Sequence, residues 1–124
     1  MRKLYLLALA FTLASCTTKY VQTDLYFGRM IPGGDSVKAK DWDIFVRNDI
    51  AKAFSAGFTV LNAKGNWLSP ETGQLVSENS EIVILIHRKH AADDKKIDSL
   101  RATYKSRFRQ ESVLRVDKKV KVSF

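Results

Sequence analysis

Residues 58–68 read FTVLNAKGNWL and residues 75–87 read LVSENSEIVILIH, and these two β-rich runs decide the fold. Between them, residues 69–73 read SPETG, with proline near the start and glycine at the end, which predicts a turn between antiparallel strands. Polar residues 78–81 interrupt the second run, so we expect a bulge or kink there. The centre of the chain is therefore predicted to be a long β-hairpin.

An amphipathic helix is predicted on each side of this hairpin. Before it, apolar residues recur mostly at steps of three and four, with Ser36 as the N-cap and Gly57 as the stop. After it, a helix begins near residues 92–94 with acidic residues in its first turn, as the helix dipole favours. The predicted buried faces are Trp42, Phe45, Val46, Ile50 and Phe54 in the first helix, and Ile97, Leu100, Tyr104 and Phe108 in the second.

Two outer strands complete the pattern. Residues 24–29 are rich in aromatic side chains, residues 32–35 form a loop, and residues 112–116 lead into an alternating tail at residues 120–124. The order strand, helix, strand, strand, helix, strand is typical of the ferredoxin-like plan. We therefore predict an α+β, two-layer sandwich with an antiparallel sheet and both helices on one face.

The predicted central strands are apolar on both faces. Either Ile82, Ile84 and Ile86, or else Val83 and Leu85, must point away from the helices, where water would meet them. A second copy of the chain, a different partner, or the tail at residues 120–124 would cover this face. We predict a homodimer through the open sheet face, with a different partner or coverage by the tail as the two alternatives.

The first fifteen residues predict an export signal. Arg2 and Lys3 precede an apolar run at residues 4–14 that is too short to span a bilayer. Residues 13–16 read LASC, which resembles the bacterial lipobox, whose cysteine thiol accepts a lipid. We predict a signal peptide over 1–15, a lipidated tether over 16–22 beginning at Cys16, and a single domain over 23–124. Thr17 favours the outer membrane, facing the periplasm.

Composition and charge narrow the function classes. A chain that is 45% hydrophobic and 27% charged is not wholly disordered, and its single cysteine excludes an internal disulfide. The net charge is +8, and residues 88–124 hold 12 basic and 5 acidic groups. For an exported protein the partner is an anionic envelope component rather than nucleic acid. The alternative is a solvated face that only confers solubility.

Short blocks run in order along the domain. They are LYFG at 25–28, GFTV at 57–60, AKGNW at 63–67, ENS at 78–80, YKSRF at 104–108, QESVLR at 110–115 and VSF at 122–124. This series resembles the bacterial domain-of-unknown-function family 3574, whose members are small exported or lipid-anchored proteins. The resemblance implies no established activity.

The residues that could carry chemistry form a loose set. His87, His90, Asp93 and Asp94 imply no four-ligand geometry, so we predict neither metal nor cofactor. The arginines of the set could bind a carboxylate or phosphate, its Glu could act as a base or an ion-pair partner, and its Trp could stack on a sugar. A structural network is the alternative. The candidate ligand-binding residues are Tyr26, Arg29, Trp67, Glu78, Gln110, Glu111 and Arg115.

Two functions of different class follow from these observations. The sequence favours a non-catalytic binding or assembly module of the cell envelope. The alternative is a small cofactor-free enzyme with a pocket between sheet and helices. We expect the enzyme if Glu78 or His87 is excluded from solvent beside a cavity of ligand size.

Overall fold

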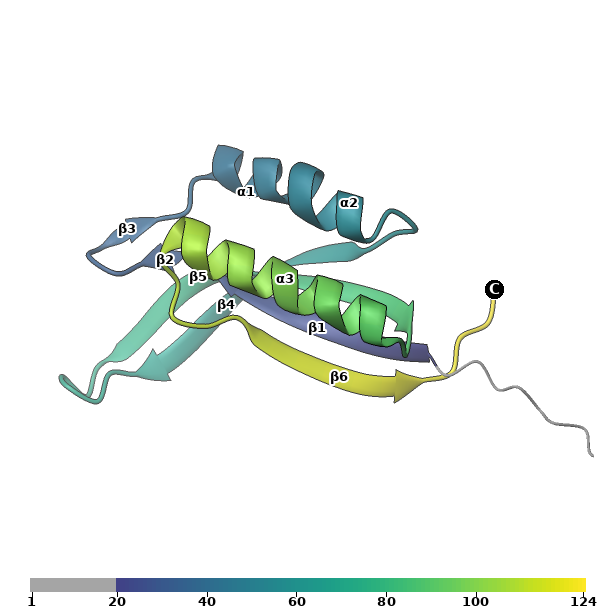
Figure 1. Cartoon of the computed structure of the whole chain (residues 1–124). Helices are drawn as coiled ribbons and strands as arrows, with labels where there is room; N and C mark the ends of the chain where they lie inside the picture. Colours follow the sequence, from purple (N-terminus) through teal and green to yellow (C-terminus); the bar gives the residue numbers. More distant parts are fainter. Residues whose placement is uncertain (1–19) are drawn as a thin grey trace, which may run out of the picture.

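The computed structural model describes residues 20–124, so the predicted signal peptide, the lipidation of Cys16 and residues 16–19 of the tether lie outside the described residues. Within them, the main sheet has the strand order β4-β5-β1-β6, with every pair antiparallel. The helices cover one of its faces (Figure 1). This arrangement confirms the ferredoxin-like α+β prediction. The strands are β1 (Tyr20–Gly28), β4 (Thr59–Leu68), β5 (Leu75–Arg88) and β6 (Leu114–Val120).

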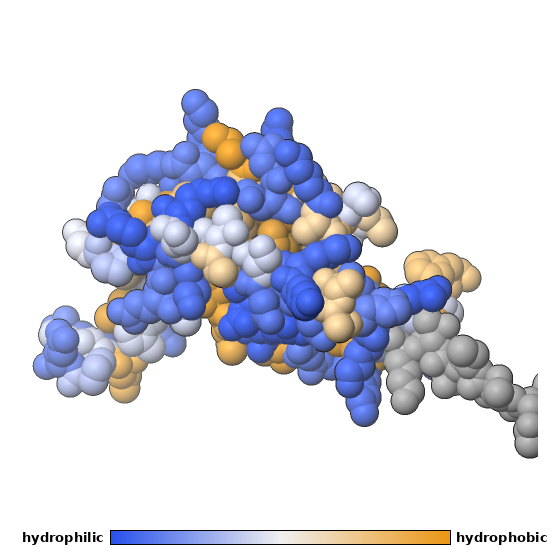
Figure 2. All heavy atoms as spheres, in the orientation of Figure 1, coloured by the Kyte–Doolittle hydropathy of each residue, from blue (hydrophilic) through white to orange (hydrophobic). Residues whose placement is uncertain are grey.

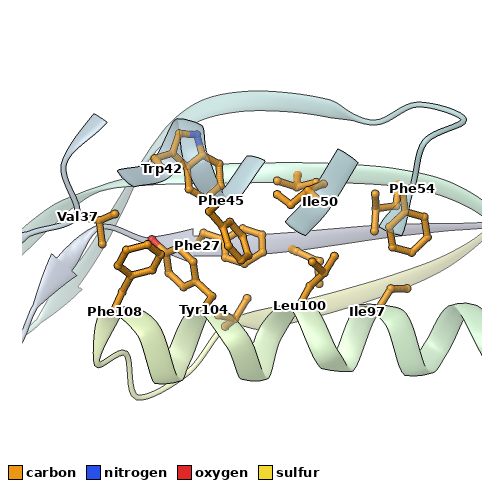
Figure 3. Packing of buried hydrophobic residues seen from close by; sticks show 14 residues of the cluster. Phe27, Val37, Trp42, Phe45, Ile50, Phe54, Ile97, Leu100, Tyr104 and Phe108 are labelled. Atoms are coloured by element: carbon orange, nitrogen blue, oxygen red, sulfur yellow. The ribbon is translucent and has the colours of Figure 1, made fainter. Parts of the chain in front are cut away.

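Aromatic side chains fill the space between the helices and the sheet (Figure 3). The first helical segment is α1 (Ala39–Phe45), the π-helix η1 (Val46–Ile50) and α2 (Ala51–Ala53), and the second is α3 (Ala91–Phe108). Phe27 of β1 lies at the centre, with its ring 4.8 Å from that of Tyr104 and 5.5 Å from that of Phe45. Both predicted helix faces are confirmed, except that Val46 is only partly buried.

The start of the first helix differs from the prediction. Ser36 does not cap it; Ser36 pairs with Met30 in a small hairpin of β2 (Met30–Ile31) and β3 (Asp35–Ser36). The helix instead begins at Ala39, after Lys38, without a side-chain cap. The predicted regular helix also contains the π-helical segment, which keeps Phe45 and Ile50 on the buried side although they are five residues apart.

The strand boundaries also differ in detail. β1 begins four residues earlier than predicted, because Tyr20 has cross-strand partners on both sides, Arg88 in β5 and Val120 in β6. The predicted bulge at residues 78–81 is wrong, since β4 and β5 keep one unbroken register from end to end. β6 is a single strand ending at Val120.

The two faces of β5 differ sharply in burial. Val83 and Leu85 are fully buried under the helices, so Ile82, Ile84 and Ile86 point to the opposite, open face. The tail does not cover that face, because residues 121–124 lie outside the strand and Phe124 is fully exposed. Figure 2 shows hydrophobic groups along the lower edge of the molecule, beneath a largely hydrophilic helical layer. No helix within residues 20–124 is long and apolar enough to cross a membrane.

Candidate functional site

A cleft of about 560 Å³ lies where β1 ends, on the open face of the sheet. Its floor comes from all four strands of the main sheet, and its walls come from residues 30–34 and 110–112. The volume is within the range of small-molecule sites. The floor residues are Tyr26 and Gly28 of β1, Gly65 and Trp67 of β4, Glu78 and Ser80 of β5, and Leu114 of β6.

Two glycines make room for the carboxylate of Glu78. A Cβ atom added to Gly28 would lie 2.8 and 2.9 Å from the two carboxylate oxygens, so this position tolerates no side chain without moving Glu78. Gly65 is the cross-strand partner of Glu78, and its Cβ would lie 3.6 Å from the Glu78 Cγ atom. The backbone N–H of Met30 donates to Oε2 at 3.1 Å. The carboxylate is therefore held against the sheet between two strands.

The helical layer fixes this floor from behind. Tyr104 donates its hydroxyl proton to the carbonyl oxygen of Gly28 at 2.9 Å. Burial raises the pKa of Tyr104 far above its usual value, so the phenol remains a donor at every physiological pH. Gln110 ties the two walls together, because its Nε2 donates to the carbonyl of Met30 at 2.8 Å. The cleft is thus built on ordered elements.

The lining of the cleft is acidic although the chain is basic. It contains Glu78 and Glu111 but no lysine or arginine, while the whole chain carries a net charge of +8. Among the described residues no group donates to the second Glu78 oxygen, Oε1. Tyr26 and Trp67 add aromatic surface to the lining of the same cleft, and 42% of Trp67 is exposed. A free carboxylate beside aromatic rings suits a positively charged ligand.

The structure brings together five of the seven residues proposed from sequence. Tyr26, Trp67, Glu78, Gln110 and Glu111 all line the cleft. These residues and the glycines come from four of the sequence blocks quoted above, at 25–28, 63–67, 78–80 and 110–115. The glycines and the Met30 amide were missed by sequence reasoning, and the glycines inside the blocks were the signal that could have found them.

The two arginines do not reach the cleft. Arg29 binds Glu81 through Nη1 at 2.8 Å and donates to the carbonyl of Val37, on the helix side of the sheet. Arg115 is bound by three acidic side chains, two of them near the start of α3. Its partners are Asp94, Asp98 and Asp117. Both guanidinium groups are therefore occupied, as the structural-network alternative expects.

His87 meets the condition that we set for an enzyme, but its contacts are structural. Only 7% of it is exposed, and it lines a separate hollow of about 660 Å³. Its Nε2 lies 2.8 Å from the hydroxyl of Thr23, and its Nδ1 lies 2.8 Å from the carbonyl oxygen of Arg88. No ring nitrogen is left for a substrate. Glu78 is only half-buried, and residues 20–124 hold no group of three metal-ligating side chains.

Comparisons with known proteins give a family and a fold. A family model described as "Protein of unknown function (DUF3574)" matches residues 22–124. A solved phage SAM lyase in complex with S-methyl-5'-thioadenosine has a TM-score of 0.62 at 19% identity, covering 82% of this chain and 81% of that one. The same kind of lyase in its apo state has a TM-score of 0.60 at 18% identity, with coverages of 84% and 83%. No curated protein matches the chain significantly.

Proposed function

The chain belongs to the DUF3574 family of proteins of unknown function, and we propose that it is a lipid-anchored binding protein of the bacterial cell envelope. Its ligand is a small organic cation that carries a flat ring. The observation that supports this proposal is the Glu78 carboxylate, which lies over Gly28 with one oxygen free in a cleft of about 560 Å³.

The cleft chemistry sets the ligand class. A cation would approach Oε1 of Glu78, while a ring would lie against Trp67 or Tyr26. A cation–π contact at a partly exposed site contributes roughly 0.5–1 kcal/mol, and a charge-assisted hydrogen bond roughly 1.5–3 kcal/mol. These magnitudes favour a cation over an anion, which would meet two carboxylates.

Calorimetric titration of the fragment 17–124 tests the ligand class. This fragment contains every strand, helix and core residue of the described fold. We expect benzyltrimethylammonium to bind more tightly than neutral benzyl alcohol, and benzoate not to bind. Glu78→Gln should weaken binding of the cation at least about tenfold, since it removes the charge on the free oxygen. Glu71→Gln, on the exposed turn, is the matched control. Equal binding of all three probes contradicts the proposal.

The envelope location has its own test. Cys16→Ser in the full-length chain should leave an unprocessed precursor or release the protein from the membrane fraction, because the serine hydroxyl cannot replace the lipid-accepting thiol. Metabolic labelling with a palmitate analogue should label the wild type and not the variant. A variant that is processed, acylated and sorted like the wild type overturns the lipid anchor and leaves the cleft untouched.

A second candidate function is catalysis by the same cleft. S-Adenosylmethionine carries a flat purine and a positive sulfonium, which is the ligand class that the cleft chemistry favours, and the fold is similar to that of a SAM lyase. Incubation with S-adenosylmethionine, followed by detection of S-methyl-5'-thioadenosine, tests this candidate. Release that depends on Glu78 supports catalysis. Absence of release, together with binding of benzyltrimethylammonium, supports the binding module alone.

A further inference from the structure

Positive side chains gather at the end of the sheet opposite the cleft. Here β1 begins and β6 finishes, since Tyr20 pairs with Arg88 on one side and Val120 on the other. Figure 1 shows the start of β1, the start of α3 and the C-terminus at this end. We call it the basic end and define it by the exposed residues Arg88, Lys89, Lys118, Lys119 and Lys121.

The acidic groups near the basic end are already paired. Asp24 binds Lys118 at 2.9 Å, and both Asp94 and Asp117 bind Arg115. Within residues 20–124, the side chains of Arg88, Lys89, Lys119 and Lys121 have no carboxylate at ion-pair distance. Their charge therefore faces outward without compensation.

Two further features of this end suit a lipid surface. Phe124 is fully exposed and Ile86 is 45% exposed, so apolar groups lie among the lysines. The hollow of about 660 Å³ also opens here, with Lys89, Lys118 and Lys119 in its lining. Lysines beside an exposed aromatic ring are the combination that binds an anionic membrane interface.

We propose that the basic end is a docking surface for an anionic phospholipid bilayer. Attraction to anionic lipids supplies a membrane-binding signal that is independent of any acyl chain. The orientation also fits the proposed lipid anchor, on which this step rests. Three residues lie between Cys16 and Tyr20, so the chain between these two residues has four steps and reaches at most about 14 Å. β1 then runs nine residues, about 30 Å, from the basic end to the cleft. The cleft would face away from the bilayer.

Vesicle co-sedimentation of the fragment 17–124 tests this proposal without an acyl chain. We expect binding to phosphatidylcholine vesicles that contain about one phosphatidylglycerol in four lipids, and none to pure phosphatidylcholine. Binding should fall at least tenfold between about 20 mM and about 500 mM salt. Lack of binding to the anionic vesicles at low salt overturns the docking surface, whereas the lipid anchor and the cleft are tested separately above.

Matched charge reversals separate this surface from general basicity. The triple variant Lys89→Glu, Lys119→Glu, Lys121→Glu should lose binding at least tenfold. The control triple Lys40→Glu, Lys64→Glu, Lys105→Glu changes the net charge equally at exposed lysines elsewhere and should lose no more than threefold. Equal losses overturn the proposal. Circular dichroism checks folding, and the milder Lys119→Gln, Lys121→Gln variant should show a smaller loss in the same direction.

Site-specific fluorescence then fixes the orientation. The fragment 17–124 has no cysteine, so Ser123→Cys and Thr72→Cys each give one labelling site. An environment-sensitive fluorophore at residue 123 should shift to the blue on anionic vesicles. The same fluorophore at residue 72, on the β4–β5 turn, should not shift. A shift at residue 72 alone overturns the proposed orientation.

Discussion

The two ends of the sheet use their charged side chains in different ways. At the cleft end, Glu78 is held by one backbone N–H and keeps an oxygen without a donor among the described residues. At the basic end, Asp24, Asp94 and Asp117 are each bound by a basic side chain, and the surplus lysines point outward. Residue type alone does not separate the two cases. The difference is whether another side chain of the same chain already binds the carboxylate.

The open sheet face runs between these two ends. Association of two copies through this face has the largest expected effect of the changes considered, because it would double the mass in solution. Ile84 points away from the helices at the centre of this face. Burying each such side chain contributes about 1.5–3 kcal/mol. If two copies stack there, light scattering at micromolar concentration gives a dimer mass, and Ile84→Asp gives a monomer with unchanged circular dichroism. A wild-type monomer contradicts the homodimer and leaves the cleft open to solvent.

Removing Arg115 should lower the stability of the fold while leaving the cleft intact. Arg115→Met leaves Asp94 and Asp117 without a cation, while Asp98 keeps its pair with Arg101. Asp117 is also in contact with the buried Thr23. Arg115 is 16% exposed and its partners are more exposed, so we expect a loss of about 2 kcal/mol of unfolding free energy, below the value for a fully buried pair. Urea unfolding measures this loss. Lys38→Met, which breaks an exposed pair with Asp35, should cost far less unfolding free energy, because water screens that pair. Equal losses would contradict the distinction.

Gly28→Ala should damage the cleft while leaving stability nearly intact. The new methyl group would meet the end of the Glu78 side chain, which can move, so we expect a change in unfolding free energy below about 1 kcal/mol. Binding of benzyltrimethylammonium should weaken about tenfold, because the displaced carboxylate no longer faces the cleft. Gly65→Ala is the graded control, since its Cβ would lie 3.4 Å or more from its neighbours and should change affinity less. Equal effects of the two variants would argue against the glycine cradle.

Acid should lower the stability of the folded protein by protonating Asp24, the partner of Lys118 at the basic end. Burial raises the pKa of Asp24, but hydrogen bonds from Gln22 and Lys118 lower it by more, so the pKa lies below the ordinary 3.8. When the pKa of a carboxyl group is lower in the folded state, its ionised form stabilises the folded protein at pH values above the pKa of the unfolded state. This contribution disappears as the pH falls through the pKa of the folded state. Asp24→Asn should therefore cost about 1 kcal/mol at pH 7 and much less near pH 3. An equal loss at both pH values would contradict this assignment.

Local sequence patterns were sufficient for the architecture. The apolar steps through Trp42, Ile97 and Tyr104 identified the buried helix faces, and the hairpin around residues 69–73 has the predicted strands. The π-helical turn and the unbroken register at residues 78–81 could not be predicted, because each depends on packing across the layers.

The site was only partly predictable for the same reason. Aromatic and acidic residues at strand ends pointed to Tyr26, Trp67 and Glu78, which meet on one face because strand register aligns them. In the sequence, Arg29 and Arg115 were equally good candidates for the ligand-binding site. Their internal partners come from residues far along the chain, such as Glu81 for Arg29 and Asp94 for Arg115. Only the tertiary structure shows that these charges are already used.

The most direct test is a ¹⁵N nuclear magnetic resonance titration of the fragment 17–124 with benzyltrimethylammonium. The amide of Met30 donates to Glu78, so it reports on the carboxylate, while the amides of Lys89 and Lys119 report on the basic end. We expect saturable shifts at Met30, Gly65 and Glu78, none at the two lysines, and loss of the shifts in Glu78→Gln. Shifts confined to the basic end, or shifts that survive Glu78→Gln, would contradict a cation site at the cleft.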